Sequence, residues 1–177
     1  MTEPLGTPTH ITLHWTAGGP AQTFPEYHWC VTGAGGVVQT LPIGEKGAHT
    51  WRRNSNNIGI SMCCCPPGQP PTTVQIEHTA KLVAELCMRY GIPVQGSYEG
   101  PAYRREGADT PDDTLVQVGT QACPTVTDHA WYARQDGYYP ERWDIGEYLV
   151  TILAKARWYH DALKAHTAAV EFTNHVA

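Results

Sequence analysis

The sequence lacks any apolar run approaching the roughly 18 residues that a membrane-spanning helix needs, although 41% of its 177 residues are hydrophobic. We therefore expect no insertion into a membrane. Basic clusters are also scarce, because Lys and Arg total 12 against 17 Asp and Glu, and only the Arg pairs at 52–53 and 104–105 stand together. The formal net charge of −5 consequently argues against DNA or RNA as a partner.

The first ten residues, MTEPLGTPTH, lack the basic flank and the apolar stretch of a secretory signal. We therefore expect synthesis and folding in a cytoplasm. A disulfide framework is not expected either, since three of the six cysteines are consecutive (63–65) and neighbours in a strand point to opposite faces. We interpret the cysteines as small buried hydrophobic residues. A metal cluster built from the triplet is the alternative.

The chain is long enough for one domain, residues 1–177, whose core needs no metal or disulfide to fold. Alternating and β-branched residues predict extended segments at 10–16, 27–32, 37–41, 57–65 and 125–131. The second and third of these should form a hairpin, and the fourth a central strand. Helical periodicity predicts helices at 73–90 and at about 145–166. This order of elements predicts an α/β fold of three layers, with helices flanking a central mixed β-sheet.

Two segments between these elements carry further predictions. Thr72 and Gln75 form the pattern of a capping box, and Gly91 before Pro93 should end the first helix. The segment 96–124 is rich in glycine, proline and charge and has no clear period. We interpret it as an irregular excursion within the domain, in which a short helix or strand could form at about 113–118.

Two of the nine histidines, His14 and His129, stand at the predicted carboxyl ends of strands, where side chains converge on a shared cleft. Asp144, just before the last predicted helix, offers an anionic third group. Two imidazoles and one carboxylate would hold a tetrahedral Zn²⁺ and leave its fourth position open to water. Because the three residues are widely spaced, spacing alone leaves purely structural histidines as the alternative.

Four blocks of sequence resemble, in order, the zinc-dependent N-acetylmuramoyl-L-alanine amidases, a family that includes phage endolysins and the peptidoglycan recognition proteins. The blocks are ITLHWTAGG (11–19), YHWCVTGAGGVVQ (27–39), GAHTWRRNSNNIGISM (47–62) and TDHAWYARQDGYYPERWDIG (127–146). The resemblance implies an amidase-like fold and a bound zinc ion. It also implies that His14, His129 and Asp144 are the zinc ligands.

The resemblance assigns roles to four other residues. Tyr27 corresponds to the tyrosine that these enzymes place beside the metal-bound water, and a plain strand aromatic is the alternative. Arg142 stands where the family usually has a lysine that faces the scissile carbonyl, and an ion pair with Glu141 is the alternative. His49 and Asn57 correspond to positions that line the substrate groove.

The implied reaction is hydrolysis of the amide between N-acetylmuramic acid and L-alanine in bacterial peptidoglycan. Ser61 follows IGI where the recycling amidases carry glutamate, which favours the endolysin branch. We expect a monomeric phage or prophage endolysin, made in the host cytoplasm, that acts on the cell wall after release. The alternatives are a peptidoglycan-recognition module without hydrolysis, and a zinc amidase or peptidase acting on another amide.

Overall fold

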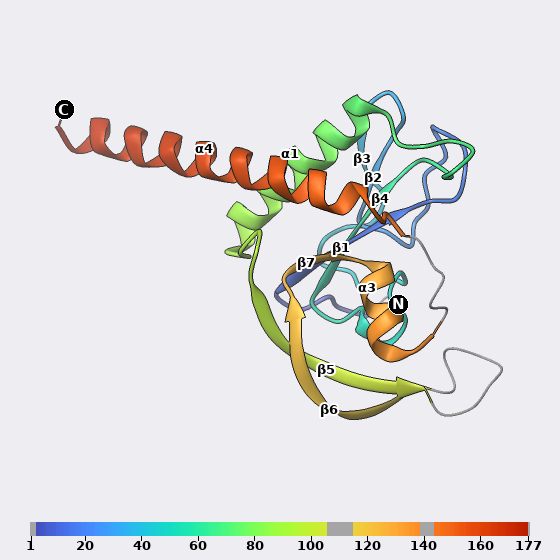
Figure 1. The fold of residues 1–177 in the computed structure, drawn as a ribbon. Coiled ribbons are helices and arrows are strands. Elements are labelled where there is room, and N and C mark those ends of the chain that lie inside the picture. Colours follow the sequence, from blue (N-terminus) through green and yellow to red (C-terminus); the bar gives the residue numbers. More distant parts are fainter. Residues whose placement is uncertain (1–2, 106–114, 139–143, 177) are drawn as a thin grey trace.

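A five-stranded mixed sheet forms the centre of the protein in the computed structural model, which describes residues 3–105, 115–138 and 144–176 (Figure 1). The strand order is β3-β2-β4-β1-β7. The strands are β1 (His10–Trp15), β2 (Trp29–Val31), β3 (Val37–Gln39), β4 (Asn57–Met62) and β7 (Val126–Asp128). Strands β2, β4, β1 and β7 run parallel, and only the β2–β3 hairpin is antiparallel. The predicted hairpin and the central position of β4 are confirmed.

Alternation along the strands separates two faces of the sheet. Ile11 and Leu13 of β1 are fully buried in the main hydrophobic core, against the helices α1 (Thr73–Tyr90) and α4 (Tyr148–Val176). Residues at the even positions of β1 point to the other face. There lie a 3₁₀ helix, η1 (Trp51–Arg53), and α3 (His129–Asp136). The prediction of a three-layer α/β domain is therefore confirmed.

The ends of the helices follow their local chemistry. Thr72 and Gln75 form the predicted capping box at the start of α1, and Gly91 ends that helix with a left-handed φ of 65°. Helix α4 continues to Val176, ten residues past its predicted end, and projects beyond the body of the molecule (Figure 1). The apolar stripe ends earlier, but the extension contains two alanines and one glutamate, which favour helix without the stripe.

The segment 96–124 is not irregular, and this corrects the prediction. Strands β5 (Ser97–Arg105) and β6 (Leu115–Pro124) pair antiparallel as a separate two-stranded sheet, so strand begins within the range 113–118. Glycine and proline inside the strands hide the period of two, and the register shifts at Ala102/Tyr103. Only residues 106–114 of this segment lie outside the described part of the chain.

Two further predictions concern the strand ends and the cysteines. Strand β7 ends at Asp128, so His129 is the first residue of α3 instead of the last part of a strand. All six cysteines are free, and five are buried as predicted, whereas Cys65 is exposed. Among the described helices, none combines the length and the apolar character that a bilayer crossing requires.

Candidate active site

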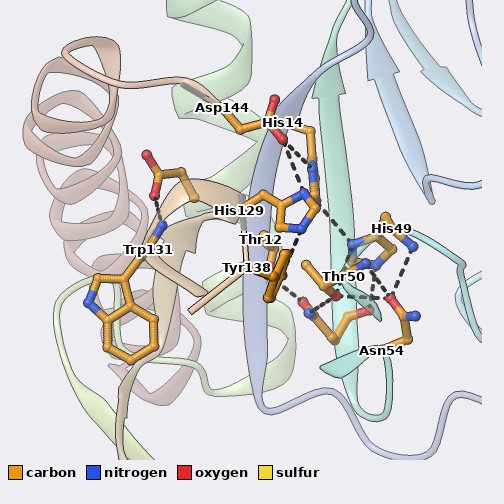
Figure 2. A network of polar contacts seen from close by, with 11 residues as sticks. Thr12, His14, His49, Thr50, Asn54, His129, Trp131, Tyr138 and Asp144 are labelled. Atoms are coloured by element: carbon orange, nitrogen blue, oxygen red, sulfur yellow. Dashed lines mark hydrogen bonds and ion pairs between the residues drawn. The ribbon is translucent and has the colours of Figure 1, made fainter. Parts of the chain in front are cut away.

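The predicted metal ligands His14, His129 and Asp144 come together at one end of the sheet (Figure 2). His14 lies near the end of β1, His129 opens α3, and Asp144 precedes α4. Their side chains are almost fully buried, and one potential ligand atom from each lies within 4.8 Å of the other two. The fold thus gathers three residues of which the first and the last, His14 and Asp144, are 130 positions apart in the chain.

The carboxylate of Asp144 orients both imidazole rings. Its Oδ2 lies 3.1 Å from Nδ1 of His129 and 3.5 Å from Nδ1 of His14. The outer nitrogens have other partners: Nε2 of His14 lies 3.1 Å from Nδ1 of His49, and Nε2 of His129 lies 2.9 Å from the hydroxyl of Tyr138. Both Nδ1 atoms therefore face the same carboxylate oxygen.

This arrangement fits a zinc ion. Two imidazole nitrogens and one carboxylate oxygen are a donor set that zinc prefers. Ligand atoms about 2.0 Å from a tetrahedral metal are about 3.3 Å apart, close to the two distances between Asp144 and the imidazoles. His14 and His129 also have hydrogen-bond partners at Nε2, namely His49 and Tyr138. Metal-ligating histidines need such a partner on the second ring nitrogen to fix the orientation of the ring.

Burial and hydrogen bonding set the charges at the site. Burial on its own raises the pKa of Asp144, but the hydrogen bonds from His129 and His14 outweigh it and bring that pKa below the usual range. Burial lowers the pKa of His49, and the neighbouring His14 and His28 lower it further. At neutral pH the site therefore holds a carboxylate anion and a neutral His49.

A cleft of about 310 Å³ opens beside the three residues. Its lining residues are Thr16, Phe24, Glu26, Tyr27, Ala48, His49, Trp51 and His129. The ring centre of Tyr27 lies 5.0 Å from that of His14 and 6.1 Å from that of His49. Two residues predicted to contact water or substrate, Tyr27 and His49, thus lie in the cleft. Arg142 falls outside the described residues.

Asn57 lies beneath the cleft instead of in its wall. Its side chain is fully buried, accepts a hydrogen bond from the Thr12 hydroxyl and donates to the Thr50 hydroxyl. Asn54 accepts hydrogen bonds from the backbone of His49 and Thr50 on the same loop (Figure 2). The prediction that Asn57 lines the substrate groove is therefore wrong. Its side-chain amide instead supports the loop that carries His49.

Sequence reasoning missed Tyr138. This tyrosine is 1% exposed and lies just after Gly137, whose left-handed φ of 76° ends α3 and turns the chain back toward His129. A glycine directly after a short helical segment is a signal for such a reversal. This signal could have drawn attention to Tyr138, although not to its contact with His129.

The sequence matches a family model described as N-acetylmuramoyl-L-alanine amidase over residues 4–138. The chain belongs to this amidase family. The match includes His14 and His129 and ends six residues before Asp144, so the proximity of Asp144 to the two histidines is seen only in the structure.

Solved amidases, endolysins and recognition proteins share the fold at low sequence identity. N-acetylmuramoyl-L-alanine amidase LysC from Clostridium intestinale is 15% identical with a TM-score of 0.58, over 89% of this chain and 90% of its own. The endolysin of Thermus scotoductus bacteriophage Ph2119 is 16% identical with a TM-score of 0.57, over 88% of each chain. Drosophila peptidoglycan recognition protein SD is 14% identical with a TM-score of 0.54, over 86% of this chain and 83% of its own. Comparison with curated proteins returns no significant match.

Proposed function

We propose that this amidase-family protein is a zinc-dependent hydrolase that cleaves the bond between N-acetylmuramic acid and L-alanine in peptidoglycan. The observation that carries the proposal is the buried cluster of His14, His129 and Asp144 with a cleft beside it. A structural zinc site is closed by four protein ligands, whereas a catalytic site has three and leaves one position for water or substrate. The three donors and the adjoining cleft support the catalytic kind.

Each residue of the site has a part in the proposed reaction. Bound zinc would lower the pKa of a water molecule to about 7 and polarise the scissile carbonyl. His14, His129 and Asp144 would hold the ion, and His49 would fix the ring of His14 through its outer nitrogen. Tyr27, in the cleft beside His14, would orient the attacking water or donate a hydrogen bond to the intermediate.

Arg142 completes the proposed machinery. Arg142 stands two residues before Asp144, where the family usually has a lysine. Its guanidinium can stabilise the developing oxyanion. We propose that the protein acts as a monomer of one catalytic domain. As a phage or prophage endolysin, it would reach the cell wall after release from the host cytoplasm.

Recognition of peptidoglycan without hydrolysis is the second candidate, because the fold is shared with Drosophila peptidoglycan recognition protein SD. One experiment separates the two. Purified peptidoglycan is incubated with the zinc-loaded protein, and the products are separated and weighed by mass spectrometry. The amidase releases stem peptides with a free L-alanine amino group and leaves lactyl groups on the glycan. A recognition module sediments with peptidoglycan and releases nothing, whereas a peptidase cuts at another amide.

The ligand variants supply the first prediction. Each of His14→Ala, His129→Ala and Asp144→Ala should lower the zinc content and abolish release of stem peptides, because three ligands are the minimum of a catalytic site. His166→Ala, which changes an exposed histidine on α4, is the control and should retain both the zinc content and the release of stem peptides. Zinc content and product release are measured on the same preparations. Full activity of His14→Ala would refute the metal mechanism.

A further inference from the structure

The β5–β6 hairpin stands apart from the five-stranded sheet and lies against α3 (Figure 1). None of its residues lines the cleft beside the metal site. Its contacts instead lead to a side chain that touches a predicted metal ligand. These contacts suggest what the hairpin does for the site.

A small hydrophobic cluster, separate from the main core, joins the hairpin to the end of α3. Leu115 of β6 packs there with Ala133 and Tyr138, and all three are buried. Trp51 of η1 and Tyr103 of β5 cover this cluster. The rings of Trp51 and Tyr138 meet edge to face, with centres 5.8 Å apart and planes at 86°. Side chains from both hairpin strands therefore belong to the cluster in which the ring of Tyr138 is packed.

The confined ring presents its hydroxyl to His129. The oxygen lies 2.9 Å from Nε2 of His129, while Nδ1 on the other side of the imidazole faces Asp144 at 3.1 Å. An imidazole that binds a metal through Nδ1 carries its proton on Nε2, which then donates to the tyrosine oxygen. Contacts on opposite sides fix both the rotation and the tautomer of the ring.

We propose that Tyr138 is a positioning residue for the metal ligand His129, and that the β5–β6 hairpin, through Leu115, holds Tyr138 in place. This inference rests on the proposed zinc role of His129. It assigns a function to strands β5 and β6 that is distinct from substrate binding: the hairpin acts on the metal site through the packed side chains of Leu115 and Tyr138.

A second set of contacts joins the hairpin to α3. Arg53 of η1 makes two hydrogen bonds of 2.6 Å to Asp136 at the end of α3. Its guanidinium also lies over the rings of Tyr103 and Tyr132, at 5.1 and 4.8 Å from their centres. One buried cation of η1 thus contacts both β5 and α3, the elements around Tyr138.

The test compares two hydroxyl deletions in the full chain. Tyr138→Phe removes the contact with His129. Tyr132→Phe, in the same region, removes an equally buried hydroxyl that bonds Tyr98, 3.1 Å away, and no metal ligand. The zinc dissociation constant is measured by competition with a chromophoric chelator, without any substrate. We expect it to rise about 10- to 100-fold in Tyr138→Phe, as loss of an outer partner does elsewhere, and to stay within about threefold of wild type in Tyr132→Phe.

The cobalt-substituted protein gives a second readout. The visible absorption of bound Co²⁺ reports ligand geometry, so its bands should shift in Tyr138→Phe and stay in Tyr132→Phe. For the hairpin, Leu115→Ala should weaken zinc binding in the same direction, and the exposed neighbour Val116→Ala should not. Circular dichroism identifies unfolded variants. If Leu115→Ala unfolds, Leu115→Val provides the comparison with the fold retained.

The outcomes distinguish this inference from the proposed function. Unchanged zinc affinity and unchanged cobalt bands in Tyr138→Phe overturn the positioning role, whatever the protein hydrolyses. Weaker zinc binding in Tyr138→Phe, with no stem peptide released by the wild type, supports the positioning role and refutes the amidase. A wild type that binds no zinc refutes both.

Discussion

His10 and His14 show how differently two histidines on one strand face can be used. Both are buried on β1, four residues apart. His14 faces the carboxylate of Asp144, whereas His10 stacks on Tyr98, with ring centres 4.3 Å apart and planes at 15°. Burial, and secondarily the charge of Arg53, lower the pKa of His10 to about 4. The same residue type therefore serves packing at one end of the strand and belongs to the predicted metal site at the other.

His10 predicts a loss of stability in mild acid. Its pKa is about 6.5 in the unfolded chain and about 4 in the folded one. Protonation therefore favours the unfolded state, and the stability present above pH 6.5 falls as the pH drops toward 4. We expect the wild type to lose up to about 3 kcal/mol more than His10→Phe over this window. Urea unfolding at several pH values measures the difference, and parallel curves for the two proteins would contradict it.

Among the elements, the short helix α3 contains two residues on which the candidate site depends. It has eight residues, with His129 as its first and Asp136 as its last. Asp128 caps its start by accepting a hydrogen bond from the backbone of Trp131, 2.8 Å away. A small displacement of this helix would move the predicted metal ligand His129 directly. Its attachment to η1 through the Arg53–Asp136 pair is therefore important for both stability and geometry.

Breaking that pair should be costly. Asp136→Ala leaves the guanidinium of Arg53 buried without its carboxylate, and we expect the free energy of unfolding to fall by about 3–5 kcal/mol. Gln135→Ala, which changes an exposed neighbour on the helix, should have little effect. The double variant Arg53→Met/Asp136→Leu should recover part of the loss because it leaves no buried charge. Wild-type stability of Asp136→Ala in urea would show that the pair does not hold α3.

At the scale of the whole molecule, the two faces of the sheet divide stability from chemistry. The main core lies between the sheet and the helices α1 and α4, with Ile11, Leu13 and Ile60 fully buried in it. The polar network around His14 occupies the opposite face (Figure 2). Folding is therefore driven by a core that does not include the predicted metal ligands.

Removal of zinc should consequently leave the protein folded. We expect far-ultraviolet circular dichroism to be unchanged after exhaustive chelation, and the melting temperature to rise again when zinc is added. At a free zinc concentration 100 times the dissociation constant, binding adds about 2.7 kcal/mol to the stability of the folded state. If chelation unfolds the protein, the zinc is structural, because its binding energy would then be folding energy.

Local patterns in the sequence were sufficient for much of this architecture. The alternation of β1, the capping box at Thr72 and the left-handed Gly91 depend on neighbours within a few residues, so they are readable from the chain alone. The same holds for the order of the elements, and hence for the mixed sheet. His14, His129 and Asp144 could be selected because residue type, predicted strand ends and the ordered blocks of the family agreed on them.

Contacts between distant segments were decided only by the tertiary structure. The regular β5–β6 hairpin, the pair of Arg53 with Asp136 and the approach of Tyr138 to His129 all depend on how separate elements pack. Asn57 illustrates the reason. Its position in the sequence corresponds to a residue that lines the substrate groove, but in the structure its side chain is buried in the protein. A local pattern predicts which residues share a strand or helix face. Which other element that face meets, and which polar atom finds a partner there, depends on the free energy of the whole packed chain.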